Sequence, residues 1–172
     1  MFDTIAGLPL HPLVVHAVEV IVPLAAVAVV LAALWPRFRR WAFALPLLLA
    51  LAAVVLVPVA TQSGEALEER VGESGAVEVH AHLADTLLPW VVALAVVAAG
   101  LFWTTWRARR GEAAGPHRAA PTRAVALVLV VASLVVASGT LVQAVRIGHS
   151  GATAVWAHTV TSDRVGGDAD ED

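Results

Sequence analysis

The sequence of 172 residues contains no cysteine, and its single methionine is Met1. The absence of cysteine excludes disulfide bonds, thiolate zinc sites, cysteine-bound iron–sulfur clusters and covalently attached c-type haem. The lone methionine also excludes a copper site lined by methionine side chains. Any metal or haem must therefore be held by histidine, carboxylate or backbone oxygen.

Charged residues are scarce as well: they make up 15% of the chain, whereas 59% of it is hydrophobic. A soluble domain has about 25% charged residues, so this composition is typical of an integral membrane protein. Four apolar runs of about twenty residues predict four membrane-spanning helices and an all-α four-helix bundle. The predicted spans are residues 13–35, 41–60, 83–106 and 124–145.

The segments around the spans predict one membrane domain over residues 1–158 and an acidic tail, residues 159–172, whose composition favours disorder. Between the second and third spans, Ser63 followed by Glu65 and Glu68 predicts a short interfacial helix with acids in its first turns. No basic segment precedes the first apolar run and no small-residue cleavage pattern ends it, so we expect this run to be a retained span.

The sequence has no lysine, so arginine is its only permanently positive side chain. The distribution of arginine along the chain predicts how the protein is oriented in the membrane. The loops after the first and third predicted spans hold Arg37, Arg39, Arg40, Arg107, Arg109, Arg110, Arg118 and Arg123. Since arginine excess marks the cytoplasmic side, we expect both loops inside and both termini outside. The predicted location is the cell membrane of a bacterium or archaeon.

Six of the seven histidines gather at the predicted outer ends of the spans, and His117 lies in an inner loop. The six are His11, His16, His80, His82, His149 and His158. A protein that served only as a membrane scaffold would need none of these histidines, which favours a functional cluster. The structural alternative is that each histidine lies at the level of the lipid headgroups and only hydrogen-bonds the backbone of a loop. His80 is about 200° from His82 round a helix and is the one expected to face solvent.

Helical spacing selects His16 and His82 as the preferred pair. His16 shares a helical face with Glu19, and His82 shares one with Asp85. Because Glu19 lies about one turn inside the apolar zone, we expect it to face a partner, either His16 or Arg146. A carboxylate beside a ligating histidine would also fix the orientation of the imidazole ring.

Imidazoles on facing helices can hold haem or a metal ion. The predicted cofactor ligands are His16 and His82, with His11 and His149 as alternates. The first candidate cofactor is b-type haem, held by two histidines because no other axial ligand is present. The alternative is zinc or copper, bound by His16 and His82 together with Glu19 and Asp85.

Several motifs run through the chain: H-P-x-x-V-H at residues 11–16, T-x-x-G-E-A-x-E-E at 61–69, H-x-H at 80–82 and R-x-G-H-S-G at 146–151. Over about residues 5–155 the sequence resembles the membrane family catalogued as domain of unknown function 2231. It departs from that family at Ala17 and Val18, where Phe-Pro is frequent. The resemblance implies a redox setting, since some relatives are joined to Rieske-type iron–sulfur domains.

Three functions are open at this point. The first is a redox-associated membrane protein that binds b-type haem near the outer face and exchanges electrons with a quinone or an outer-face redox protein. The second is a zinc- or copper-binding protein, to which Glu65, Glu68 and Glu69 would add ligands, and the third is a non-catalytic subunit of a membrane complex. An enzyme acting alone is not expected, because the sequence has no H-E-x-x-H or G-x-S-x-G motif. Nothing in the sequence indicates nucleic-acid binding.

Overall fold

The computed structural model describes residues 4–5, 8–71, 75–114 and 122–167, and it describes side chains within residues 10–69, 75–111 and 122–156. Two short strands, β1 (Thr4–Ile5) and β2 (Leu8–Pro9), pair antiparallel ahead of the helices. The helices are α1 (Leu10–Leu34), α2 (Pro36–Ala42), α3 (Leu45–Val71), α4 (Gly75–Asp85), α5 (Leu87–Ala114) and α6 (Arg123–Gly167). Apart from the hairpin, the described chain is helical, as the sequence predicts.

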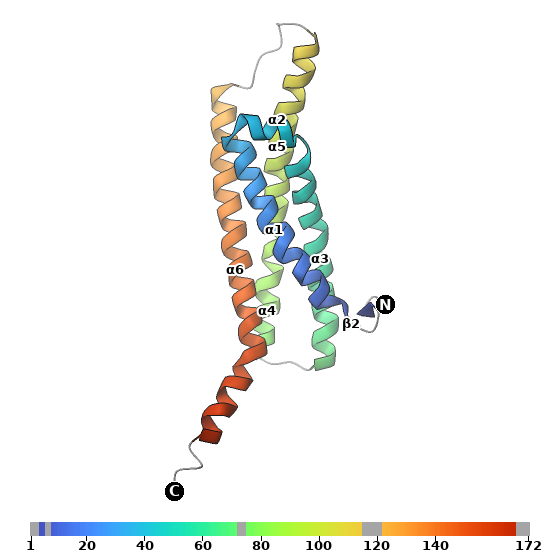
Figure 1. Cartoon of the computed structure of the whole chain (residues 1–172), viewed down its shortest axis with the longest axis vertical. Coiled ribbons are helices and arrows are strands. Elements are labelled where there is room, and N and C mark those ends of the chain that lie inside the picture. The colour runs from blue at the N-terminus through green and yellow to red at the C-terminus, as the bar shows by residue number, and fades with distance from the viewer. Residues whose placement is uncertain (1–3, 6–7, 72–74, 115–121, 168–172) are drawn as a thin grey trace.

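The long helices α1, α3, α5 and α6 form a four-helix bundle (Figure 1). α1 packs against α3 and α6, and α5 packs against the same two helices, so α1 and α5 lie across the bundle from each other. Four helical segments of the described chain are long and apolar enough to cross a membrane, which confirms the predicted number of membrane-spanning helices. Exposed apolar side chains such as Val20, Leu48 and Val135 cover the flanks, where they contact the lipid bilayer.

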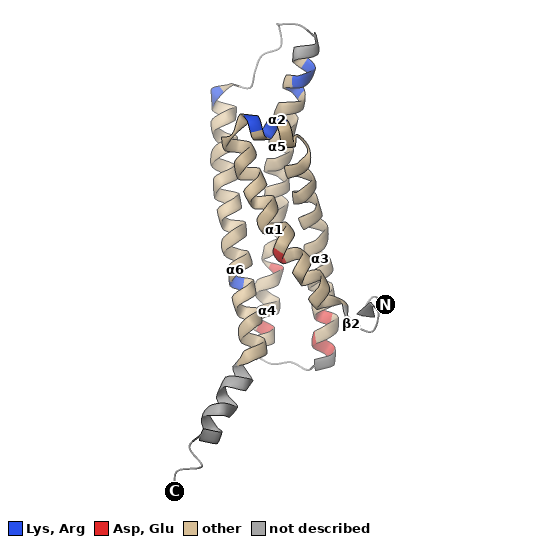
Figure 2. Ribbon diagram, in the orientation of Figure 1, with Lys and Arg blue, Asp and Glu red and all other residues tan. Residues whose placement is uncertain are grey.

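The two ends of the bundle differ in charge (Figure 2). The arginine end carries Arg37, Arg39, Arg40, Arg107, Arg109, Arg110 and Arg123. The opposite end carries Glu65, Glu68, Glu69 and Glu78. By their positions in α1, α4 and α6, the described histidines His11, His16, His80, His82 and His149 belong to the same end, which we call the histidine end. Among the described side chains, Arg146 of α6 is the one arginine placed towards the histidine end. The bundle therefore has the charge asymmetry on which the predicted orientation depends.

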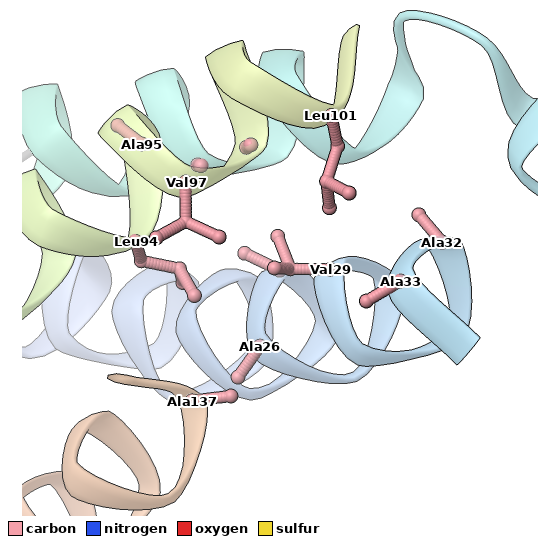
Figure 3. Packing of buried hydrophobic residues seen from close by; sticks show 12 residues of the cluster. Ala26, Val29, Ala32, Ala33, Leu94, Ala95, Val97, Leu101 and Ala137 are labelled. Carbon is pink, nitrogen blue, oxygen red and sulfur yellow. The ribbon is translucent and has the colours of Figure 1, made fainter. Parts of the chain in front are cut away.

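The interior consists mainly of alanine, valine and leucine side chains (Figure 3). Val29 of α1 packs with Leu94 and Leu101 of α5, while Ala26 of α1 lies beside Ala137 of α6. Between helices surrounded by lipid, attraction comes from close packing rather than from exclusion of water. Small side chains allow that packing because they let the helix backbones approach each other.

A break at Thr86 separates α4 from α5. α4 ends at Asp85, and Pro89 favours a break here because it has no N–H and its ring would clash with the carbonyl of Asp85 in a continuous helix. The hydroxyl of Thr86 donates to the carbonyl of Leu83 at 2.6 Å. The side-chain amide of Gln143 in α6 donates to both the Leu83 carbonyl and the Thr86 hydroxyl. These bonds attach the end of α4 to α6. Because the helix is broken at Thr86, the rotation of α4 about its own axis does not have to follow that of α5.

Two segments differ from their predicted form. The residues after Ser63 continue α3 as far as Val71, because the Ser63 hydroxyl donates to the Ala60 carbonyl and does not cap a new helix. A short helix does follow α3, but it is α4 (Gly75–Asp85), which lies within the third membrane-length segment, Gly75–Gly111. α6 continues to Gly167, so the start of the predicted tail is helical. Residues 168–172, His117 and Arg118 lie outside the described residues, as does the side chain of His158.

Two glycines of α6 provide a matched test of the packing. A Cβ atom added at Gly139 would lie 2.0 Å from Cζ3 of Trp90, whereas one added at Gly148 would meet nothing within 4 Å. We expect Gly139→Ala to destabilise the bundle by about 1–3 kcal/mol through overpacking. Gly148→Ala should leave stability unchanged or raise it by up to about 1 kcal/mol. Thermal denaturation in detergent measures both variants, and equal midpoints would contradict the close contact with Trp90.

Candidate histidine site

The preferred pair from the sequence, His16 and His82, has both side chains exposed in the structure. Within the described part of the chain, the two rings have no direct hydrogen bond to each other. Nδ1 of His16 donates to the carbonyl of Pro12 in the same helix. Asp85 and His149 are exposed too. These predicted ligands therefore lie on the outside of a single bundle.

Glu19, predicted to face His16 or Arg146, lies on the flank of α1. Its side chain is exposed, and so is that of Arg146. Among the described side chains, no ion pair joins Glu19 to either predicted partner. The structure therefore does not place this carboxylate next to a ligating histidine.

His11, an alternate ligand in the sequence prediction, lies in the first turn of α1 and packs against α3. Its Nδ1 atom lies 3.0 Å from the carbonyl oxygen of Ala60 and 3.4 Å from the hydroxyl oxygen of Ser63. A Cβ atom added at Gly64 would come within 3.0 Å of Cε1 in the ring. Because Gly64 has no side chain, it leaves the space that the imidazole occupies. The Ala60 carbonyl and the Ser63 hydroxyl lie within hydrogen-bond distance of Nδ1 of the ring.

His80 of α4 has the same arrangement on α6. Its Nδ1 atom lies 3.0 Å from the hydroxyl oxygen of Ser150, and a Cβ atom added at Gly151 would lie 3.1 Å from its Cε1 atom. His80 is half-buried and His82 is exposed, which is the reverse of the predicted exposures. The prediction was wrong because it continued the phase of the third span into α4, whereas the break at Thr86 lets α4 pack its His80 face on α6.

The hydrogen bonds favour a proton on Nδ1 in each neutral ring. A carbonyl oxygen only accepts, so His11 donates to Ala60 from Nδ1. The Ser150 hydroxyl lies 2.8 Å from the carbonyl of Ile147 and 3.0 Å from Nδ1 of His80. When it donates to the carbonyl, its oxygen accepts from Nδ1 of His80. With this assignment both Nε2 atoms carry a lone pair.

Both half-buried imidazoles lie at the histidine end, His11 on α1 against α3 and His80 on α4 against α6. The charge on His11 is one of the influences on His80, and α4 packs against both α3 and α6. No group of three or more histidine, cysteine, aspartate or glutamate side chains converges on a metal-sized site in the described part of the chain. The arrangement is therefore a pair of imidazoles from α1 and α4, each fixed at Nδ1.

Sequence reasoning missed His80, and the signal that pointed to it was weak. A Ser-Gly dipeptide lies beneath each ring, at Ser63-Gly64 and Ser150-Gly151, but the same dipeptide also occurs at residues 74–75 and 138–139. The dipeptide alone does not reveal which copies meet an imidazole. That choice depends on how α3, α4 and α6 are rotated about their axes.

The sequence model of a family described as "Predicted membrane protein (DUF2231)" matches residues 7–164. The match covers most of the chain and confirms the resemblance drawn from the motifs. No curated protein and no solved structure matches the chain.

The protonation of the two rings is directly measurable. Nitrogen-15 NMR of the histidine-labelled protein in detergent, at about pH 9 where histidine is neutral, should show Nδ1–H tautomers for His11 and His80. His82 is the internal control, because its exposed ring has no hydrogen-bond partner among the described residues and should give averaged shifts. An Nε2–H tautomer for either half-buried ring would contradict the hydrogen bonds to Ala60 and Ser150.

Proposed function

The chain belongs to the DUF2231 family of predicted membrane proteins. We propose that this membrane protein binds a metal centre at the histidine end through His11 and His80. The observation that carries the proposal is the common geometry of the two rings. Each is half-buried, held at Nδ1 by a hydrogen bond and open at Nε2. The two Nε2 lone pairs are the groups that would ligate the metal.

This geometry is the one that metal-ligating histidines usually have. A histidine that binds metal through one ring nitrogen donates its other N–H to a carboxylate, a backbone carbonyl or a water, which orients the ring and raises the basicity of the ligating atom. Ala60 accepts that bond from His11. Ser150 accepts it from His80 while passing its own hydrogen to Ile147. Both rings are thus oriented before a ligand arrives.

The number of ligands favours b-type haem, which His11 and His80 would hold through their two imidazoles. Zinc sites need at least three protein ligands, and no third histidine or carboxylate joins the pair among the described residues. Non-covalent binding agrees with the absence of cysteine. Apolar surroundings for a macrocycle lie further into the bundle, where Val22, Val57 and Val91 are buried and Ile147 packs against them.

A centre at this position would exchange electrons on one side of the membrane. The described histidines all lie at the histidine end, so nothing among them provides a second centre at the arginine end. A quinone in the bilayer or a redox protein in the adjacent aqueous space is the kind of partner that this placement suits. Because arginine excess marks the inner face, we place the histidine end on the outer side of the cell membrane.

Absorption spectroscopy of the full chain, purified in detergent and supplied with haemin, tests this function. We expect a Soret band and, after reduction, the sharp α and β bands of six-coordinate iron. His11→Ala and His80→Ala should each lower haem affinity by at least about tenfold, since even the loss of an outer-shell partner costs 10–100-fold. His16→Ala and His82→Ala are the matched controls and should keep the spectrum.

The contrary outcomes are distinct. Loss of the bands in His16→Ala and His82→Ala, with His11→Ala and His80→Ala intact, would return the site to the pair selected from the sequence. A colourless protein with stoichiometric zinc or copper by elemental analysis would replace the haem by a metal ion, which neutral imidazole also suits. A colourless, metal-free protein that takes up no haemin would refute the metal centre.

A further inference from the structure

A cavity of about 230 Å³ opens at the arginine end, between α2 and α5. Three arginines line it: Arg39 and Arg40 from the last turn of α2, and Arg109 from α5. Thr104 and Thr105 belong to the α5 wall. Pockets for drug-sized ligands span about 300–1,000 Å³, so this cavity suits a small charged group rather than a whole ligand.

Arg109 is held in place at the rim. Its guanidinium carbon lies 4.1 Å from the centre of the Phe43 ring, and its Nη2 donates to the carbonyl of Arg40. Phe43 has φ of 44°, a region that a bulky residue rarely adopts, and its ring packs on Phe102 with centroids 4.9 Å apart. The bond to Arg40 occupies one of the five N–H donors of Arg109, so the others are available to a ligand.

The positive charge of this cavity has no described counter-charge. Burial lowers the pKa of the Arg39 guanidinium, and the neighbouring charge of Arg40 lowers it further. An adjacent carboxylate would raise this pKa instead. The acidic side chains that the structure describes lie towards the histidine end or on the flank of α1 (Figure 2). Among the described side chains, the cavity is therefore a concentration of cations without an acidic neighbour.

The cavity lies where the apolar part of the bundle ends. Trp35, Trp41, Trp103 and Trp106 belong to the same end, and Trp41 and Trp103 are 77% and 51% exposed. Exposed tryptophan is enriched at the level of the lipid headgroups. An anion that reaches the three arginines is thus expected at headgroup depth.

We propose that Arg39, Arg40 and Arg109 bind the phosphate group of an anionic membrane phospholipid. Guanidinium groups bind phosphate through paired, charge-assisted hydrogen bonds, and basic pockets between membrane helices bind lipid headgroups. A free phosphate anion offers the same chemistry. The lipid is the better match because its phosphate already lies at this depth, beside the exposed apolar flanks of the bundle. The site is at the opposite end from His11 and His80 and does not depend on them.

Two double variants of the full chain test the proposal. Arg39→Gln/Arg109→Gln removes two charges from the cavity, whereas Arg37→Gln/Arg110→Gln removes two from the same end without touching its lining. Native mass spectrometry of the detergent-purified proteins counts bound phosphatidylglycerol, with phosphatidylcholine as the net-neutral comparison. We expect the cavity variant to bind about tenfold less phosphatidylglycerol than the wild type, as the loss of charge-assisted bonds predicts. The Arg37/Arg110 variant should match the wild type.

Equal loss of lipid in both double variants, or loss in neither, would overturn the proposal. Inorganic phosphate is the second probe: if it binds and is lost with Arg39 and Arg109 while phosphatidylglycerol is not retained, the lipid assignment is wrong. Arg39→Lys/Arg109→Lys keeps the charge and covers the case in which the glutamine variant does not fold. It should bind less lipid than the wild type because an ammonium group makes no paired contact, and equal binding would count against the site.

Discussion

A chain surrounded by lipid tails has to satisfy its polar groups within the protein, and this constraint shapes most of the bundle. The hydroxyls of Ser133, Thr140 and Thr105 are buried, and each donates to a carbonyl one turn earlier in its own helix. Gln143 satisfies its polar group across helices. Its side-chain amide donates to the Leu83 carbonyl and the Thr86 hydroxyl, at the junction between α4 and α5. Within the described part of the chain, no buried side-chain nitrogen or oxygen atom lacks a partner.

The histidine pair follows this rule at Nδ1, which in His11 and in His80 is bonded to a neighbouring helix, so each ring contributes to packing. Both rings are only half-buried, and neither Nε2 is among the buried atoms without a partner in the described part of the chain. Each imidazole therefore joins a fixed Nδ1 to an Nε2 that is accessible at the end of the bundle.

The spans could be predicted because length and composition alone identify a membrane helix, and arginine counts alone predict the two ends. The site could not, because it depends on helix rotation. His80 and His82 are two residues apart, and which of them faces inwards is decided by the attachment of α4 to α6, through Thr86 and Gln143 at a separation of 57 residues. The arginine cavity likewise depends on tertiary packing. Arg39 and Arg109 are 70 residues apart and line one cavity because α2 packs beside α5, which no local sequence pattern predicts.

The length of α6 gives the protein a rigid arm. With 45 residues at about 1.5 Å per residue, the helix is roughly 67 Å long, about twice the ~30 Å of a hydrocarbon core. It begins at the arginine end with Arg123, crosses the bundle and continues past the other helices (Figure 1). A continuous helix transmits position along its axis, so the part of α6 beyond the other helices keeps a set direction relative to the bundle. Any movement of α6 against α4 would also move that arm, with Ser150 and Gly151 near its base.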